Sequence, residues 1–237
     1  MMITQKAAQP IPDLCYQDDD LLVVNKPAGL LSIQDGYDQS LPHLRSILEP
    51  RYGALWMVHR LDKDTSGLVI LARNEEAHRI LNHFFREHQI EKKYHALVTP
   101  LPDWQEINIQ LPLTVDADRK HRTRVNRSSG KEAHSICRVL KRFALGALME
   151  IQILTGITHQ IRAHLREYDL QIIGESLYSA GLPIPPIEAP RMMLHARSLN
   201  FPHPLSGAPL NLPAPYPEDF REIYTTLKTT RAQDAMI

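Results

Sequence analysis

The hydrophobic pattern divides the chain into short apolar runs separated by turn residues. Leu21–Val24 and Leu68–Ala72 are continuous, short and rich in β-branched or aliphatic residues, a pattern typical of strands buried on both faces. Met149–Leu154 alternates between apolar and polar positions and predicts a half-buried strand. Residues 91–98 and 192–196 are two further strand candidates. The chain therefore combines several strands with the helices described next.

Helical periodicity is clearest after Asn74. Asn74 is a suitable N-cap, two glutamates follow it in the first turn, and one face is apolar, made of Ala77, Ile80, Leu81, Phe84 and Phe85. A short helix is predicted from Ser40 to Tyr52. A third is predicted to run from a Thr158 cap to Tyr168, with its apolar positions on one side.

Composition places the chain among ordinary globular proteins. Of its 237 residues, 43% are hydrophobic and 23% are charged, and the 27 basic and 27 acidic side chains cancel. Two cysteines fit a reduced intracellular protein better than a disulfide scaffold. The amino terminus lacks the apolar segment of a signal peptide, and no apolar run approaches the ~20 residues of a membrane span. We expect a cytoplasmic monomer that does not enter membranes, with a loose lead-in (1–13), one domain (14–224) and a tail (225–237).

The stretch HRLDKDTSG, His59–Gly67, contains the strongest candidate for chemistry. Its Asp62 precedes small, turn-prone residues and a buried strand, so it is expected in a loop tied to that strand. Residues two apart in an extended segment face the same side, which predicts an ion pair between Arg60 and Asp62 that keeps the carboxylate ionised. A positioned, ionised Asp can act as a nucleophile or a base. From the tetrapeptide HRLD alone, an Asp that only hydrogen-bonds its own turn is the commoner explanation.

Basic residues gather between residues 119 and 142. Glu132 is the one acid among nine basic side chains: Arg119, Lys120, Arg122, Arg124, Arg127, Lys131, Arg138, Lys141 and Arg142. Ser128–Gly130 supplies a turn, so the segment predicts a basic hairpin. Such clustered charge on a neutral protein indicates a contact with RNA or DNA phosphates, and a solvated charged surface is an equal alternative.

No metal site is predicted. The twelve histidines form no dense cluster with cysteine at zinc spacing. The acidic triplet Asp18–Asp20 is more typical of a solvated strand entry than of a metal site.

The string HRLDKDTSGLVILA, with NKPAGLL before it and THQIRAHL after it, resembles the RluA family of RNA pseudouridine synthases, whose signature is HRLDxxTSG. The resemblance runs from about Asp18 to Phe220 and fits the compact form without an N-terminal S4 domain. It implies an α+β fold with a mixed, largely antiparallel sheet and flanking helices. It also implies isomerisation of selected uridines to pseudouridine in structured ribosomal or transfer RNA, on a flipped nucleotide. Neither a metal nor an organic cofactor is expected, because the reaction is redox-neutral.

The resemblance also assigns roles to single residues. Asp62 starts the reaction, Arg162 pairs with it, and Tyr94, the Tyr of the family's K-x-Y segment, stacks on the base and can move a proton. Arg60 fills the space that the flipped nucleotide leaves. Other residues expected at the substrate are Leu194, Lys26, His59, Gln160, Arg122 and Arg124, with Lys26 available for a phosphate.

Two positions depart from the family pattern. Ile157 stands where the family usually has Arg, which predicts a weaker phosphate contact. Glu175 stands where relatives usually have Asp, so the hydrogen bonds of that Asp are expected to change.

Two other functions are compatible with parts of the sequence. One is an inert RNA-binding relative, against which the intact Asp62, Tyr94 and Arg162 argue. The other is a carboxylate-dependent nucleosidase or glycosidase, which would release the free base and normally needs a second catalytic carboxylate. Only Asp64 is near enough in sequence to supply it.

Overall fold

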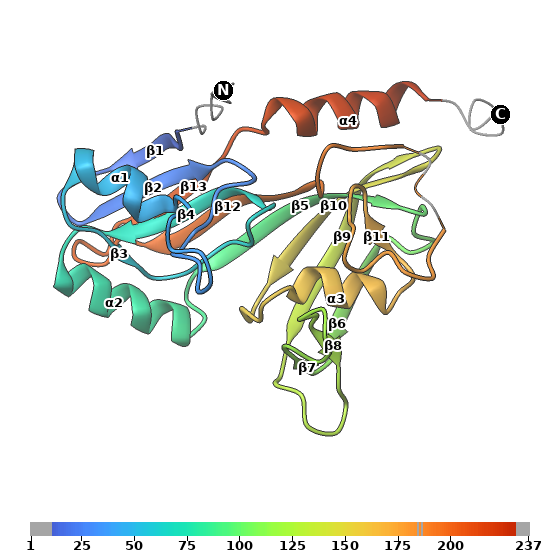
Figure 1. Ribbon diagram of the computed structural model, residues 1–237, viewed down its shortest axis with the longest axis horizontal. Coiled ribbons are helices and arrows are strands. Elements are labelled where there is room, and N and C mark those ends of the chain that lie inside the picture. Colours follow the sequence, from blue (N-terminus) through green and yellow to red (C-terminus); the bar gives the residue numbers. More distant parts are fainter. Residues whose placement is uncertain (1–10, 184, 186, 231–237) are drawn as a thin grey trace, which may run out of the picture.

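A computed structural model describes residues 11–183, 185 and 187–230 (Figure 1). Its main sheet is made of β1 (Asp13–Gln17), β2 (Leu21–Lys26), β3 (Trp56–Met57), β4 (Ser66–Ala72), β5 (Glu91–Thr99), β6 (Glu106–Gln110), β9 (His134–Phe143), β10 (Gly146–Ile153), β11 (Gln171–Ile172), β12 (Leu194–Pro202) and β13 (Pro209–Pro213). A separate two-stranded ladder contains β7 (Leu113–Thr114) and β8 (Arg124–Val125). The helices are α1 (Leu44–Tyr52), α2 (Glu75–Arg86), α3 (Gln160–Arg166) and α4 (Glu218–Thr229).

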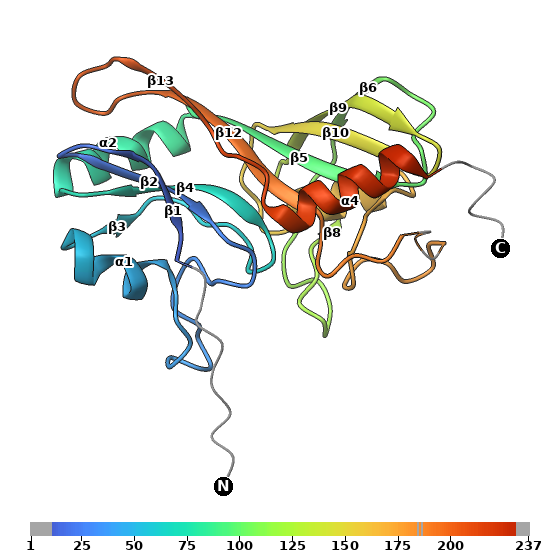
Figure 2. The same cartoon turned by 90° about the horizontal axis from the view of Figure 1, so that it is seen from above.

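The strand order is β1-β2-β4-β12-β5-β10-β9-β6, with β3 on β4, β11 on β5 and β13 on β12. Only β4 and β12 pair in parallel among the described strands of this sheet, and every other pairing is antiparallel. In Figure 1, α2 and α3 lie below the sheet and α4 lies above it. Figure 2, seen from above, shows α4 in front of the sheet near β5 and β10. The predicted α+β fold, with a mixed and largely antiparallel sheet flanked by helices, is confirmed.

The two continuous apolar runs form neighbouring central strands. Every residue of β2 and of β4 is buried. Alternate positions of β2 enter two separate cores, with Leu22 and Val24 in one and Leu21 and Val23 in the other. A strand that is covered on both faces needs apolar residues at every position, which explains why these segments do not alternate.

Gly67 lets β4 and β12 approach each other. Its φ is 117°, and a Cβ atom at this position would lie 2.3 Å from the carbonyl oxygen of Ala196. Only a residue without a side chain tolerates both conditions. The parallel pairing of Ser66 with His195 follows, and it brings the loop before β4 beside Leu194 at the start of β12.

The helix boundaries differ from the predictions in two places. Asn74 caps α2 as expected, since its side chain accepts from the Ala77 N–H. By contrast, Thr158 does not cap α3, because His159 adopts a left-handed conformation with φ 56° and the helix begins only at Gln160. The α1 helix likewise begins at Leu44 rather than near residue 40.

The basic segment from 119 to 142 is not one hairpin, so that prediction was wrong. The short β8 pairs with β7, whereas β9 pairs with β6 and β10. Alternate residues in the first half of β9 are buried, so one face of this strand packs into the core of the protein.

The predicted domain boundary at residue 225 falls within α4, whose Leu227 is buried in the core. Of the predicted lead-in, residues 1–10 lie outside the described part, as do residues 231–237 of the predicted tail.

Within the described residues, no helix combines the length and the apolar character needed to cross a membrane.

Candidate active site

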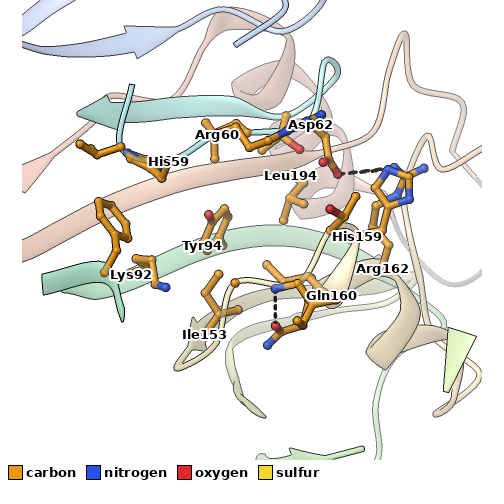
Figure 3. Close-up of a pocket in the computed structure, with 18 of the residues that line it drawn as sticks. His59, Arg60, Asp62, Lys92, Tyr94, Ile153, His159, Gln160, Arg162 and Leu194 are labelled. Carbon is orange, nitrogen blue, oxygen red and sulfur yellow. Dashed lines mark hydrogen bonds and ion pairs between the residues drawn. The ribbon is translucent and has the colours of Figure 1, made fainter. Parts of the chain in front are cut away.

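A cavity of about 440 Å³ opens between α2, the loop before β4, strand β5 and the loop that enters α3. Figure 3 shows Asp62, His159 and Arg162 at one end of the cavity and Tyr94 and Leu194 in the middle. The opposite end contains His59 and Lys92. The volume lies within the range of small-molecule sites, which is roughly 300–1,000 Å³. The sequence signature and the segment that contains Arg162, 100 residues apart, therefore meet in one cavity.

The backbone on both sides of Asp62 is fixed by the loop after β2. Ser32 Oγ accepts from the Leu61 N–H at 3.0 Å and donates to the Leu61 carbonyl at 2.8 Å. On the other side, the carbonyl of Lys63 accepts from the Gly29 N–H at 2.8 Å. These bonds hold the loop without using the Asp62 carboxylate, which stays free to face the cavity.

Lys26 completes this support from inside the protein. Its Nζ donates to the carbonyls of Pro27, Leu30 and Lys63 at 3.0, 2.8 and 3.1 Å, and the side chain is 0% exposed. Burial lowers the pKa of Lys26 to about 7. The expectation that Lys26 is available for a phosphate is therefore wrong, because its ammonium group is enclosed by main-chain carbonyls.

Lys26→Met is expected to lower the free energy of unfolding by at least about 2 kcal/mol, because three carbonyls lose their hydrogen-bond donor. The exposed neighbour Lys63 provides a control, and Lys63→Met is expected to change stability by less than about 0.5 kcal/mol. Urea denaturation of the three proteins measures the difference. Equal stability of Lys26→Met and wild type would contradict the structural role.

Arg162 links Asp62 to Glu175. Its Nε and Nη2 donate to the two carboxylate oxygens of Glu175 at 2.7 and 2.8 Å, while Nη1 lies 3.6 Å from Asp62 Oδ2. Burial alone would lower the pKa of Arg162, but the hydrogen bonds and charge of Glu175 raise it. The guanidinium is thus a fixed cation that leaves one edge for Asp62.

Glu175, one of the two expected departures from the family pattern, is well suited to its position. Besides binding Arg162, its Oε1 accepts from the backbone N–H groups of Leu177 and Tyr178 at 2.7 and 3.3 Å. The longer side chain therefore makes a complete set of local hydrogen bonds. Ile157, at the other departure from the pattern, packs against the small apolar cluster that includes Tyr178.

His159 is a second group beside Asp62. Its Nε2 lies 3.6 Å from Asp62 Oδ2, and its Nδ1 lies 3.1 Å from the hydroxyl of Tyr178. That hydroxyl also accepts from the Thr123 N–H at 2.7 Å. Burial lowers the pKa of His159, which favours the neutral ring despite the charge of Asp62. When Nδ1 accepts from Tyr178, the proton on Nε2 points toward Asp62.

Tyr94 and Leu194 form the apolar middle of the cavity. Both are almost fully buried and both line it. Burial, with the charge of Asp62 adding to it, raises the pKa of the Tyr94 hydroxyl. A neutral phenol beside an aliphatic side chain gives a flat, apolar surface on which a base can stack.

Comparison with known proteins identifies the family. Residues 20–167 match the family model for RNA pseudouridylate synthases. This chain belongs to that family. It is 35% identical over 202 residues to the dual-specificity RNA pseudouridine synthase RluA of Haemophilus influenzae, covering 84% of this chain and 90% of that protein. It is 33% identical over 254 residues to ribosomal large subunit pseudouridine synthase D of Xanthomonas campestris, covering 98% and 74%. The solved structure of human RNA pseudouridylate synthase domain containing 4 has a TM-score of 0.75 at 26% identity, covering 91% and 92%.

The protein is therefore an RNA pseudouridylate synthase, an isomerase that acts on RNA. In this enzyme, three residues predicted from sequence to act in catalysis lie together: Asp62, Tyr94 and Arg162 all line the cavity. The predicted pair between Arg60 and Asp62 does not form. Arg60 is exposed on the cavity rim and has no ion pair in the described part of the chain, because the loop turns Asp62 toward Arg162 instead.

Two residues expected at the substrate have structural partners. His59 Nε2 accepts from the Ile70 N–H at 2.9 Å and its ring stacks on Phe85, while burial lowers its pKa to about 3. The Gln160 amide is fully used, accepting from Thr155 Oγ and the Ile157 N–H and donating to two groups of β9. Gln160 therefore shapes the cavity wall without a free polar group for the substrate, whereas His59 Nδ1 has no hydrogen bond within the described residues.

Arg122 and Arg124 lie outside the cavity and share one acid. Their guanidinium groups bind the same oxygen of Asp118, with closest distances of 2.7 and 2.8 Å. Hydrogen bonds from Arg122 come first among the causes that lower the pKa of Asp118. The pair therefore presents less net positive charge than its two arginines suggest.

The acidic triplet at the start of β2 contributes to a cluster of Asp18, Asp20 and His203 that could in principle hold a metal ion. Asp18 instead accepts from two backbone N–H groups and from Tyr16, and His203 Nε2 lies 2.9 Å from it. His203 Nδ1 accepts from two backbone N–H groups, so Nε2 carries the proton. The cluster is explained by these hydrogen bonds.

Sequence reasoning did not single out His159, Glu175 or Lys92 as site residues, although each stands in a family motif. His159 precedes the QIR of the Arg162 segment, and Lys92 opens the K-x-Y segment of Tyr94. Their places in these motifs were the available signal. The contacts themselves depend on segments distant in sequence.

Proposed function

We propose that this enzyme converts selected uridines of structured RNA to pseudouridine, with Asp62 as the nucleophile and the target nucleotide flipped into the cavity. The observation that carries the proposal is one carboxylate, Asp62, at the end of a partly apolar cavity beside a fixed guanidinium. A uridine stacked in a helix cannot reach such a recessed group. Extruding it costs a few kcal/mol, and stacking on Tyr94 offsets part of this cost.

The reaction breaks the bond between ribose C1′ and uracil N1 and forms one between C1′ and C5. Asp62 attacks the nucleotide and the bond from C1′ to N1 breaks. The ring turns while it is held between Tyr94 and Leu194, and C5 is joined to C1′ as the bond to Asp62 is broken. The hydrogen at C5 leaves as a proton, and N1 gains a proton. Arg162 and His159 keep the carboxylate oriented throughout. Arg60, on the rim, is proposed to occupy the space left in the RNA stack.

A base-releasing hydrolase is the less favoured alternative. Among the described residues that line the cavity, Asp62 is the only carboxylic acid. Asp64, the nearest candidate in sequence, is exposed and does not line it. A glycosidase mechanism normally needs a second carboxyl group flanking the same bond.

We further propose ribosomal RNA, transfer RNA or both as substrates. One relative is named for the ribosomal large subunit and another for dual specificity. Arg122 and Arg124 are proposed to contact RNA phosphates outside the cavity. This contact requires that at least one of their ion pairs with Asp118 is broken or weakened.

Mapping pseudouridines in ribosomal and transfer RNA, from cells with and without the gene, tests this function. Specific pseudouridines are expected to disappear in the deletion strain. They should return when the wild-type gene is restored, and should stay absent when Asp62→Asn is expressed at the same level. An unchanged map in the deletion strain would contradict the proposed substrates.

A further inference from the structure

The cavity contains a lysine without an acidic partner. Lys92 on β5 is 7% exposed, and among the described residues its Nζ takes part in no hydrogen bond or ion pair. It lies 5.8 Å from the centre of the Phe85 ring. Burying an ammonium group without a counter-charge is costly. Folding stability therefore does not explain this side chain.

The strand geometry directs Lys92 into the cavity. Residues two apart on a strand point to the same side, so Lys92 and Tyr94 share the cavity face while Lys93 points away. Figure 3 places the Lys92 side chain beyond Tyr94 as seen from Asp62. Two strand residues span about 6.6–6.8 Å, so a group at Lys92 lies within the reach of a nucleotide whose base stacks on Tyr94.

The surroundings of Lys92 are suited to an anion. No carboxylate lines this end of the cavity among the described residues. The exposed Arg86 also lines it, but its charge is partly offset by Glu87, whose Oε1 lies 3.1 Å from Arg86 Nε. His59 stays neutral here, since burial and then the Lys92 charge lower its pKa to about 3. Gly156 lies close to Lys92, and a Cβ atom there would be 4.0 Å from Nζ, so the backbone at this position does not crowd the ammonium group.

We propose that Lys92 forms a subsite for a backbone phosphate that flanks the flipped uridine. This inference rests on the proposed function. A phosphate supplies the negative charge that no described protein group provides beside Lys92, and lysine binds phosphate as a compact point charge. The contact positions the nucleotide along the cavity, so that its C1′ lies before Asp62 while the base lies on Tyr94. Lys92 is a positioning residue in this scheme.

The test compares Lys92→Met and Lys92→Arg with Lys93→Met. Lys93 is a matched control, being adjacent in sequence, on the opposite face, and paired with Glu91 at 3.3 Å. The probe is an RNA fragment that carries a mapped target uridine. Its dissociation constant is measured over a range of KCl concentrations, with kcat/KM from tritium release at C5 of the target uracil.

Lys92→Met is expected to weaken binding about tenfold at low salt, as for one lost charged contact, and to flatten the slope of log affinity against log salt by about 0.7. Lys92→Arg should keep most of the slope, and Lys93→Met should match wild type. Thermal unfolding distinguishes a structural role from a binding role. If Lys92 stabilised the fold, Lys92→Met would melt at a lower temperature than wild type, whereas here the variant should be at least as stable as wild type. An unchanged slope in Lys92→Met, or an equal change in Lys93→Met, would overturn the proposal.

A neutral methylphosphonate at the 5′ or 3′ phosphate of the target uridine identifies the partner. At one of the two positions, wild type should lose about as much affinity as Lys92→Met, and the combination should lose little more. Additive losses at both positions would overturn the phosphate subsite and assign Lys92 to an uncharged group such as a uracil carbonyl. If wild-type enzyme binds the RNA but releases no tritium, the proposed function is contradicted. The phosphate subsite is then still tested by the slope of log affinity against log salt in Lys92→Met.

Discussion

Arg162→Met is expected to lower kcat for pseudouridine formation about 100-fold to 1,000-fold, the range for removal of one preorganised charge-stabilising donor. Asp62 would lose the guanidinium that lies 3.6 Å from its Oδ2. RNA binding should change much less, because Arg162 is largely buried and directed to two carboxylates rather than to the rim. Single-turnover rates at saturating enzyme measure the chemical step separately from binding.

Stability must be separated from catalysis in this experiment. Removing Arg162 leaves Glu175 buried without its partner, which costs about 3–5 kcal/mol when a buried pair is broken. The double variant Arg162→Met/Glu175→Gln removes both charges and is expected to regain stability without regaining activity. Arg166→Met is a control on the same helix, outside the cavity, and should remain active. Wild-type kcat in folded Arg162→Met would contradict the role of the pair.

The sequence was sufficient to predict the elements that depend on local pattern. The continuous apolar runs of β2 and β4, and the Asn74 cap of α2, follow from hydrophobicity and hydrogen bonding within a few residues. The resemblance supplied what pattern could not, namely that Asp62 and Arg162 belong to one site.

Long-range partners could not be predicted, and they account for the wrong expectations. From the sequence, Lys26 is expected in a turn with an ammonium group open to a ligand. One of its three acceptors in the structure, the Lys63 carbonyl, is 37 residues away in the chain. Arg60 and Asp62 would share a side in an ideal strand, but the structure has a loop there and Asp62 turns to Arg162. These outcomes depend on tertiary packing, which overrides local geometry.

Asp62→Asn is expected to abolish pseudouridine formation while RNA binding largely survives, because the amide keeps the size of the side chain and removes its charge. Asp64→Asn is a close control, two residues away in the same loop. Asp64 is exposed and its side chain does not line the cavity, so this variant should keep near wild-type activity. Both variants should unfold at nearly the same denaturant concentration as wild type, since no hydrogen bond within the described structure depends on the Asp62 carboxylate.

Release of tritium from C5 of the target uracil tests the central claim most directly, because that hydrogen must leave when the new carbon–carbon bond forms. The RNA is labelled with [5-³H]uridine and incubated with wild type, Asp62→Asn or Asp64→Asn. Wild type and Asp64→Asn are expected to release one tritium for each pseudouridine formed, and Asp62→Asn none above background. Release by Asp62→Asn at a near wild-type rate, or free uracil that retains its tritium as the wild-type product, would contradict an isomerase that uses Asp62 as its nucleophile.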